Sequence, residues 1–198
     1  RQMCIRDRYV LILCLIAFLI LIQFNLLTVV LGVSSMLLAF AYPFMKRYTH
    51  FPQAFLGIAF SWGIPMAFSA GRGSLDSTMW LLLIANWAWV IAYDTQYAMV
   101  DKDDDIKLGL KSTAIIFGKF SRLIIGVLQF FCLGLLTLLG TSHDFGMVYQ
   151  IAIFGAGLFF LYQHFLLSKA TRENYFAAFL NNHWVGFFIF LGICGNFL

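Results

Sequence analysis

The sequence MWLLLIANWAWVIAY, residues 79–93, continues without a break into DTQYAMVDKDDD, residues 94–105. The first part is an apolar stretch, and the second part holds five of the nine acidic residues of the chain. Acidic side chains crowded against an apolar stretch repel one another unless a counter-charge lies among them. A divalent cation is the counter-charge that this arrangement favours.

Apolar stretches of this kind recur along the whole chain. Of its 198 residues, 62% are hydrophobic and 11% are charged, and the mean hydropathy is +0.86. A chain with this composition has too few polar residues to cover the surface of a soluble domain. The composition therefore predicts an all-α, polytopic transmembrane helix bundle. We expect seven spans, at residues 9–27, 28–42, 55–70, 79–93, 123–139, 148–167 and 179–198.

The boundary between the first two spans is weak, because only residues 25–28 separate them. One long kinked helix with a re-entrant piece is the alternative at this point. The basic residues favour seven spans. If the N-terminus lies inside and the spans alternate, twelve of the 13 basic residues, Arg1 among them, fall on the cytoplasmic side, and only Arg72 falls outside. The net charge of +4 therefore reflects membrane orientation, and no nucleic-acid partner is expected.

Three of the acidic residues share one face if the helix of 79–93 continues through them. Asp94, Asp101 and Asp105 stand at offsets 0, 7 and 11, within an arc of about 40°, whereas Asp103 points the other way. Mg²⁺ prefers oxygen ligands and bridges carboxylates to substrate phosphates, so the three are candidate metal ligands. A solvated acidic loop tip is the alternative, and it accounts well for Asp103 and Asp104.

Basic residues lie close to this acidic segment. Lys102, Lys107 and Lys111 follow it, and Lys46 and Arg47 lie in a neighbouring loop predicted for residues 43–54. Acids that hold a metal and bases that hold free phosphate oxygens together suit a metal–phosphate ligand.

Other polar residues are interpreted as structural. Lys119, Arg122, Lys169 and Arg172 are assigned to membrane orientation. Polar side chains within apolar segments need partners, and interhelical hydrogen bonds are expected for Asn86, Gln129, Asn181, Asn182 and His183.

Several strings agree in order and spacing with UbiA-type membrane prenyltransferases. They are YPFMKRYTHFPQ at 42–53, FSWGIPMAF at 60–68, FLNNHWVG at 179–186 and the whole of 93–118. The resemblance runs from about residue 10 to the C-terminus. Within the family, the strings at 42–53 and 93–118 are similar to the branch that acts on 4-hydroxybenzoate.

The resemblance implies transfer of a polyprenyl group from polyprenyl diphosphate to position 3 of 4-hydroxybenzoate, ortho to the hydroxyl, in ubiquinone biosynthesis. It implies Mg²⁺ as cofactor, with the family's DxxxD pattern on Asp101 and Asp105 and with Asp94 one step earlier. The family's YxxxK pattern falls on Tyr42 and Lys46, where the lysine is implied to hold diphosphate. Further diphosphate contacts are expected from Arg47, Lys107 and Lys111.

The same resemblance implies a multi-pass protein of the bacterial inner membrane, with its site loops on the cytoplasmic side and an apolar tunnel for the isoprenoid tail that opens to the lipid bilayer. One departure from the family pattern is large. The family's first Asp-rich motif, NDxxDxxxD, has no match here, and the family fold has nine helices. We therefore expect residues 9–198 to form a prenyltransferase domain that lacks its first two helices, and residues 1–8 to be a flank foreign to the family. We also expect the chain alone to be inactive.

Other functions remain open on sequence grounds. A family member with another acceptor, such as homogentisate, dihydroxynaphthoate or haem, would keep the same aspartates. A cation-binding transporter is a different class, but transporters place their key charges near the bilayer midplane, and the predicted spans hold none there. A structural membrane subunit would leave the clustered acids unexplained. Prenyl chain length and oligomeric state do not follow from the sequence.

Overall fold

A computed structural model describes residues 2–197, with the side chains of residues 5–197. Arg1, counted above among the cytoplasmic charges, and Leu198, the end of the last predicted span, lie outside the described residues. The described chain is built from helices joined by short turns, as predicted. They are α1 (Gln2–Leu21), α2 (Leu26–Tyr48), α3 (Pro52–Ser61), α4 (Gly63–Arg72), α5 (Ser77–Lys107), α6 (Thr113–Phe117), the 3-10 turn η1 (Gly118–Phe120), α7 (Ser121–Ser142), α8 (Met147–Ser168) and α9 (Arg172–Asn196).

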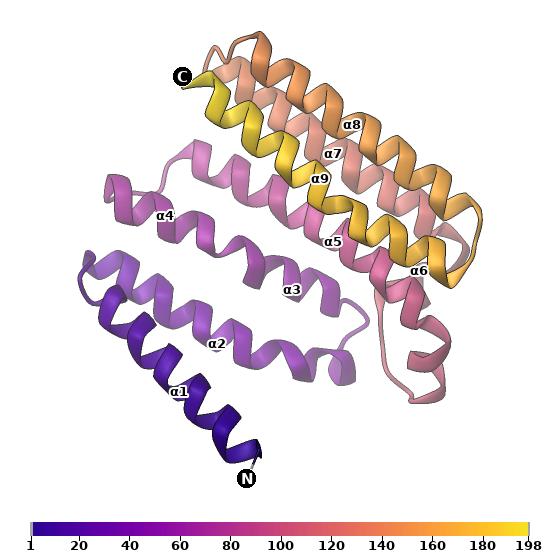
Figure 1. Cartoon of the computed structure of the whole chain (residues 1–198), viewed down its shortest axis with the longest axis horizontal. Helices are drawn as coiled ribbons and strands as arrows, with labels where there is room; N and C mark the ends of the chain where they lie inside the picture. The colour runs from indigo at the N-terminus through magenta and orange to yellow at the C-terminus, as the bar shows by residue number, and fades with distance from the viewer. Residues whose placement is uncertain (1, 198) are drawn as a thin grey trace.

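Within residues 2–197 these helices make seven long rods, because α3 and α4 stack end to end and α6 is short (Figure 1). Each predicted span lies mainly in one rod, and the fold class predicted from the sequence is confirmed. Five of the rods are long and apolar enough to cross a membrane, namely α2, α3 with α4, α6 with α7, α8 and α9. The rods α1 and α5 are not among the five; each carries a cluster of charged residues at one end.

The structure differs from the prediction in where helices end. A short turn after Leu21 separates α1 from α2, so the single kinked helix is wrong. The loop predicted for 43–54 is helical as far as Tyr48, and α5 continues through the acidic residues to Lys107. The backbone N–H and C=O groups beyond each apolar span form hydrogen bonds within the same helix. The helices therefore extend past the apolar residues from which the spans were predicted.

The rod of α3 and α4 breaks at Trp62. Pro65 has no N–H to donate to the carbonyl of Ser61 four residues earlier, so the helical ladder is interrupted there. The backbone of Trp62 keeps helical angles, φ −66° and ψ −20°, and α4 continues in nearly the direction of α3 (Figure 1). The indole N–H of Trp62 donates to the carbonyl of Leu31 at 3.0 Å, which joins the break to α2.

The central helix is α5, which packs against α3 and α4 and also against α7 and α9 (Figure 1). Its first turn is capped by Asp76, whose carboxylate accepts a hydrogen bond from the backbone N–H of Met79 at 2.9 Å. It ends at Lys107, and Gly109 two residues later has a φ of +67° that favours glycine. The backbone N–H of Leu110 then donates to the carbonyl of Asp105 at 2.9 Å. The acidic residues therefore belong to the same rigid helix as the apolar stretch before them.

A cluster of amide side chains, Gln96, Gln129, Gln163 and Asn182, connects α5, α7, α8 and α9 inside the bundle. The Gln163 Oε1 atom accepts hydrogen bonds from Gln96 at 2.9 Å and from Gln129 at 2.7 Å. The Asn182 Nδ2 atom donates to the Gln96 Oε1 atom at 2.9 Å, and Gln163 donates to Asn181 at 3.2 Å.

The interhelical hydrogen bonds predicted for Gln129, Asn181 and Asn182 are thereby confirmed. The bond predicted for Asn86 is confirmed too, because it donates to Ser61 of α3 at 2.9 Å. For His183 the prediction is wrong: its ring contacts the carbonyl of Leu180 on its own helix. That carbonyl lies one helical turn earlier, within reach of the His183 ring without any contact to another helix.

Replacing Gln163 with leucine is expected to destabilise the bundle by about 1–3 kcal/mol, because buried amides on two neighbouring helices lose their acceptor. Thermal unfolding in detergent, followed by circular dichroism, measures the change. The matched control is Gln150→Leu, which removes an exposed amide from the same helix. Equal shifts for the two variants would contradict a role for the amide cluster in stability.

The helices α8 and α9 approach closely at Gly192. A Cβ atom there would lie 2.6 Å from the Cβ of Ala152 and 3.5 Å from the Cα of Tyr149. Gly192→Leu is therefore expected to force the two helices apart and to cost about 1–3 kcal/mol. The control is Gly134→Leu, at a position where a Cβ meets nothing within 4 Å. The same unfolding measurement should show a large shift for the first variant and a small one for the second.

Candidate functional site

The last turn of α2 and the acidic end of α5 meet at an ion pair. The Nζ atom of Lys46 lies 3.4 Å from both carboxylate oxygens of Asp105. The side chain of Asp105 is 6% exposed and that of Lys46 is 30% exposed. The carboxylate is thus largely buried, where a charge without a partner would be costly, and the lysine supplies that partner.

The turn that follows α5 lies against the end of α2. The backbone N–H of Lys111 donates to the carbonyl of Lys46 at 3.0 Å, and its side-chain amine donates to the carbonyl of Tyr48 at 3.3 Å. Three predicted site residues, Lys46, Asp105 and Lys111, therefore meet at one end of the bundle although they come from two separate parts of the chain.

Asp94 lies about two helical turns before Asp101 on α5. Burial raises the pKa of Asp94 to about 6, the charge of Lys46 opposes that rise, and the charge of Asp101 adds to it. The negative charge of Asp94 acts on the hydroxyl groups of Tyr42 and Tyr93. Asp94 is therefore electrostatically coupled to the predicted residues on α2 as well as to those on α5.

The predicted carboxylates differ in how well they fit one metal ion. Within the described residues, no three His, Cys, Asp or Glu side chains come close enough together to hold a metal. Asp101 and Asp105 are separated by a rise of about 6 Å along the helix, and Asp94 and Asp101 by about 10 Å. Because Mg²⁺ commonly binds one or two carboxylates together with waters and substrate phosphates, Asp101 and Asp105 fit a shared ion. The roles of Asp94, Asp101 and Asp105 as metal ligands all stay predictions.

The first residue of α9 reaches the acidic segment from the other side. The Nη2 atom of Arg172 lies 2.9 Å from an oxygen of Asp104 and 3.9 Å from an oxygen of Asp101. From the sequence, Arg172 is predicted to serve membrane orientation and Asp104 to be solvated, so this contact was not predicted. No spacing in the sequence indicates it, because the two residues are 68 positions apart.

Two predicted diphosphate ligands stand away from the ion pair of Lys46 and Asp105. Lys107 is 74% exposed, and its Nζ atom lies 3.7 Å from an oxygen of Asp104. Arg47 is exposed at the end of α2 and forms no ion pair with any residue that the structure describes. Their roles remain predictions.

An aromatic surface between α5 and α9 adjoins Asp94. The ring of Phe179 lies 6.0 Å from that of Tyr93 and 5.0 Å from that of Tyr97, measured between ring centres. A cavity of about 360 Å³ is lined by Trp89, Tyr93, Phe179, Leu180, Asn182 and His183. Aromatic ring faces attract cationic groups, so this surface suits a ligand that is apolar or develops positive charge.

Comparison with known proteins gives a consistent result. Residues 8–192 match the UbiA prenyltransferase family. The 4-hydroxybenzoate octaprenyltransferases of Salmonella newport and Salmonella agona are each 50% identical over 186 residues, which cover 94% of this chain and 64% of the relative. The chain thus spans less than two thirds of the length of these relatives.

Two solved structures share the fold. The apo structure of a UbiA homolog from Aeropyrum pernix K1 superposes with a TM-score of 0.78 at 20% identity, over 98% of this chain and 73% of the other. A structure reported for digeranylgeranylglyceryl phosphate synthase in membranes superposes with a TM-score of 0.71 at 18% identity, over 96% and 68%. At these identities the likeness is one of fold.

Proposed function

Because this chain belongs to the UbiA prenyltransferase family, we propose that it transfers a polyprenyl group from polyprenyl diphosphate to position 3 of 4-hydroxybenzoate, in ubiquinone biosynthesis. The curated relatives named for 4-hydroxybenzoate support this acceptor. The observation that carries the proposal is the pair of Lys46 and Asp105, 3.4 Å apart. It joins a candidate phosphate ligand to a candidate metal ligand beside an aromatic surface.

The ion pair gives Lys46 a role at the leaving group. When diphosphate binds, the amine turns from Asp105 to the free phosphate oxygens and donates charge-assisted hydrogen bonds to them. The chemistry that Mg²⁺ supplies when bound at Asp101 and Asp105 is neutralisation of the negative charge that develops on the leaving diphosphate. The allylic C–O bond then breaks, and the diphosphate takes the electron pair.

The aromatic surface serves the other half of the reaction. The rings of Tyr93, Tyr97 and Phe179 keep water from the allylic carbon and stabilise its positive charge through their faces. The phenol ring of the acceptor forms the new C–C bond with its π electrons at the carbon ortho to the hydroxyl. Loss of the ring proton restores aromaticity and completes the transfer.

The proposed setting is the bacterial inner membrane, with the acidic end of α5 on the cytoplasmic side. Lys46, Lys111 and Arg172 gather at this end of the bundle. The opposite end carries Arg72, which is paired with Asp76 at 2.7 Å. An excess of basic residues on one side supports a cytoplasmic assignment for that side.

A transfer assay tests the proposal. The chain is expressed alone and also fused to those segments of the Salmonella relative that lie outside the aligned region. Membranes receive a prenyl diphosphate, Mg²⁺ and 4-hydroxybenzoate, and mass spectrometry detects the prenylated acid. We expect product from the fusion, none after chelation of Mg²⁺, and little from the chain alone. Faster transfer to homogentisate or dihydroxynaphthoate would overturn the acceptor and keep the family chemistry.

A binding measurement on the chain itself separates this function from transport. A non-reactive prenyl diphosphate analogue should bind the purified chain more tightly when Mg²⁺ is present. Binding that is insensitive to Mg²⁺, together with Mg²⁺ flux through vesicles that hold the protein, would favour the transporter instead.

A further inference from the structure

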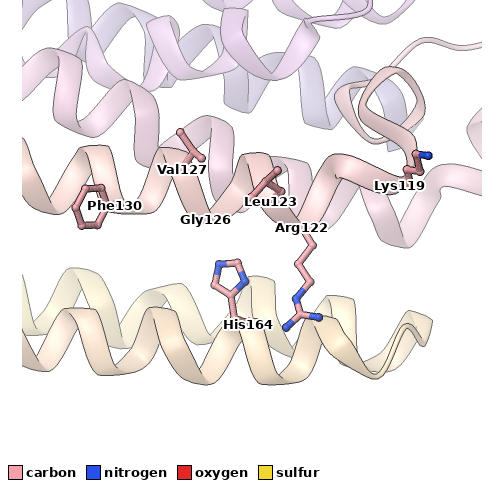
Figure 2. A pocket seen from close by; sticks show the side chains of 7 residues that line it. All are labelled: Lys119, Arg122, Leu123, Gly126, Val127, Phe130 and His164. Atoms are coloured by element: carbon pink, nitrogen blue, oxygen red, sulfur yellow. The ribbon is translucent and has the colours of Figure 1, made fainter.

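A surface groove runs between α7 and α8 and includes none of the acidic residues of α5 (Figure 2). Its volume is about 560 Å³, within the range of about 300–1,000 Å³ that is usual for small-molecule sites. Its apolar wall is formed by Leu123, Val127 and Phe130, which stand at offsets 0, 4 and 7 on one face of α7. The remaining lining residues are Lys119, Arg122, Gly126 and His164.

The two ends of this groove differ in chemistry. Lys119 and Arg122 stand at one end, before the apolar wall, and Arg122 extends from α7 toward α8 beside His164 (Figure 2). Among the residues that the structure describes, neither cation forms a salt bridge. The amine of Lys119 lies 5.2 Å from the ring centre of Phe120, a contact that leaves its N–H donors free. Two available cations therefore lie at one end of the groove, beside its apolar wall.

The floor of the groove is fixed by the bundle. A Cβ atom at Gly126 would lie 3.0 Å from the imidazole of His164, so glycine allows the ring to pack against α7. The Nε2 atom of His164 lies 3.1 Å from the Oε1 atom of Gln129, which ties the ring to the amide cluster. The groove is thus held in shape by partly buried contacts and does not depend on exposed side chains alone.

We propose that this groove binds one anionic phospholipid, with its phosphate at Lys119 and Arg122 and one acyl chain along Leu123, Val127 and Phe130. From Arg122 to Phe130 the helix rises about 12 Å, less than half of a hydrocarbon core about 30 Å thick. An acyl chain from the same leaflet is long enough to cover this wall. Charge complementarity selects an anionic headgroup, because a zwitterionic lipid brings its own cation to the two basic residues.

Native mass spectrometry of the purified chain in detergent tests this site, with dioleoyl phosphatidylglycerol as the anionic lipid and dioleoyl phosphatidylcholine as the reference. We expect one phosphatidylglycerol per chain to bind more tightly than phosphatidylcholine. Each cation removed should weaken that binding about fivefold, so Lys119→Ala with Arg122→Ala should weaken it about 25-fold. Arg122→Lys, which keeps the charge, should retain most of it.

The matched control is Lys169→Ala. Lys169 is an exposed cation at the end of α8, with its amine 4.7 Å from the ring centre of Phe165, and it does not line the groove. Its loss should leave lipid binding nearly unchanged, and circular dichroism verifies that all variants keep their helix content.

Three outcomes would overturn the proposal. Lys169→Ala could weaken lipid binding as much as the groove variants do, or the protein could bind the two lipids equally well. Glycerol 3-phosphate could also displace the bound lipid as effectively as the intact lipid does. The last of these would mean that the groove takes a free phosphate and that its apolar wall has no role. Phe130→Ala checks the wall from the other side, because a seated acyl chain predicts weaker lipid binding in that variant while both cations remain.

Discussion

Asp105→Ala is expected to lower prenyl transfer by about 10²- to 10³-fold, the loss typical of removing one group that stabilises developing charge. Asp105 is 6% exposed in its side chain and faces Lys46, so its carboxylate lies where we propose that metal and diphosphate bind. Asp101→Ala should act in the same direction, since it removes the second carboxylate one turn away. Initial rates of the fusion protein described above, at saturating substrate and Mg²⁺, measure both.

Asp103→Ala is the matched control for these two variants. Asp103 lies in the same turn of α5 but is exposed and forms no ion pair with any described residue. Its removal should leave the rate close to that of the unchanged protein. Asp105→Asn, which keeps the side-chain shape, separates loss of charge from loss of packing. Equal losses for Asp103 and Asp105 would contradict the assignment of one helix face to the metal.

Lys46→Met is expected to change two affinities in opposite directions. In the ligand-free protein, Lys46 and a metal ion compete for the Asp105 carboxylate, so removing the amine should tighten the binding of Mg²⁺ alone. The same change removes a charge-assisted donor to diphosphate, so prenyl diphosphate should bind more weakly and transfer should fall by about 10²-fold. Calorimetry with each ligand measures both affinities.

Lys169→Met controls for the loss of one positive charge at the same end of the bundle and should leave both affinities unchanged. A general fall in protein stability would weaken the binding of Mg²⁺ and of prenyl diphosphate together. Weaker binding of both ligands to Lys46→Met would therefore contradict an exchange of partners at Asp105.

The helical face of the site could be predicted from the sequence, because the helix of α5 runs unbroken through its acidic half. The offsets of Asp101 and Asp105 are a property of one regular helix, and the structure keeps that helix as far as Lys107. The bundle could be predicted for a similar reason: apolar rods in a bilayer must satisfy their backbone groups internally.

The contacts between distant segments could not be predicted in the same way. Lys46 and Asp105 are 59 positions apart. The charge pattern placed both residues at one membrane face, and the family resemblance gave each its role, but neither predicted their direct contact. Arg172 had no such motif, so its contacts with Asp101 and Asp104 went unpredicted. They depend on where α9 packs against α5, and packing between helices is decided by side-chain shape, which hydropathy does not encode.

The amide cluster has a consequence for the order in which the helices assemble in the membrane. The helices of such a bundle first enter the bilayer as separate rods, and a polar side chain then lies in hydrocarbon until another rod supplies its partner. In the order of synthesis, α5 and α7 carry Gln96 and Gln129 before α8 and α9 deliver Gln163 and Asn182. The hydrogen bonds of the amide cluster therefore form only when the last two helices have been made. A chain that stops after α7 leaves Gln96 and Gln129 without these partners.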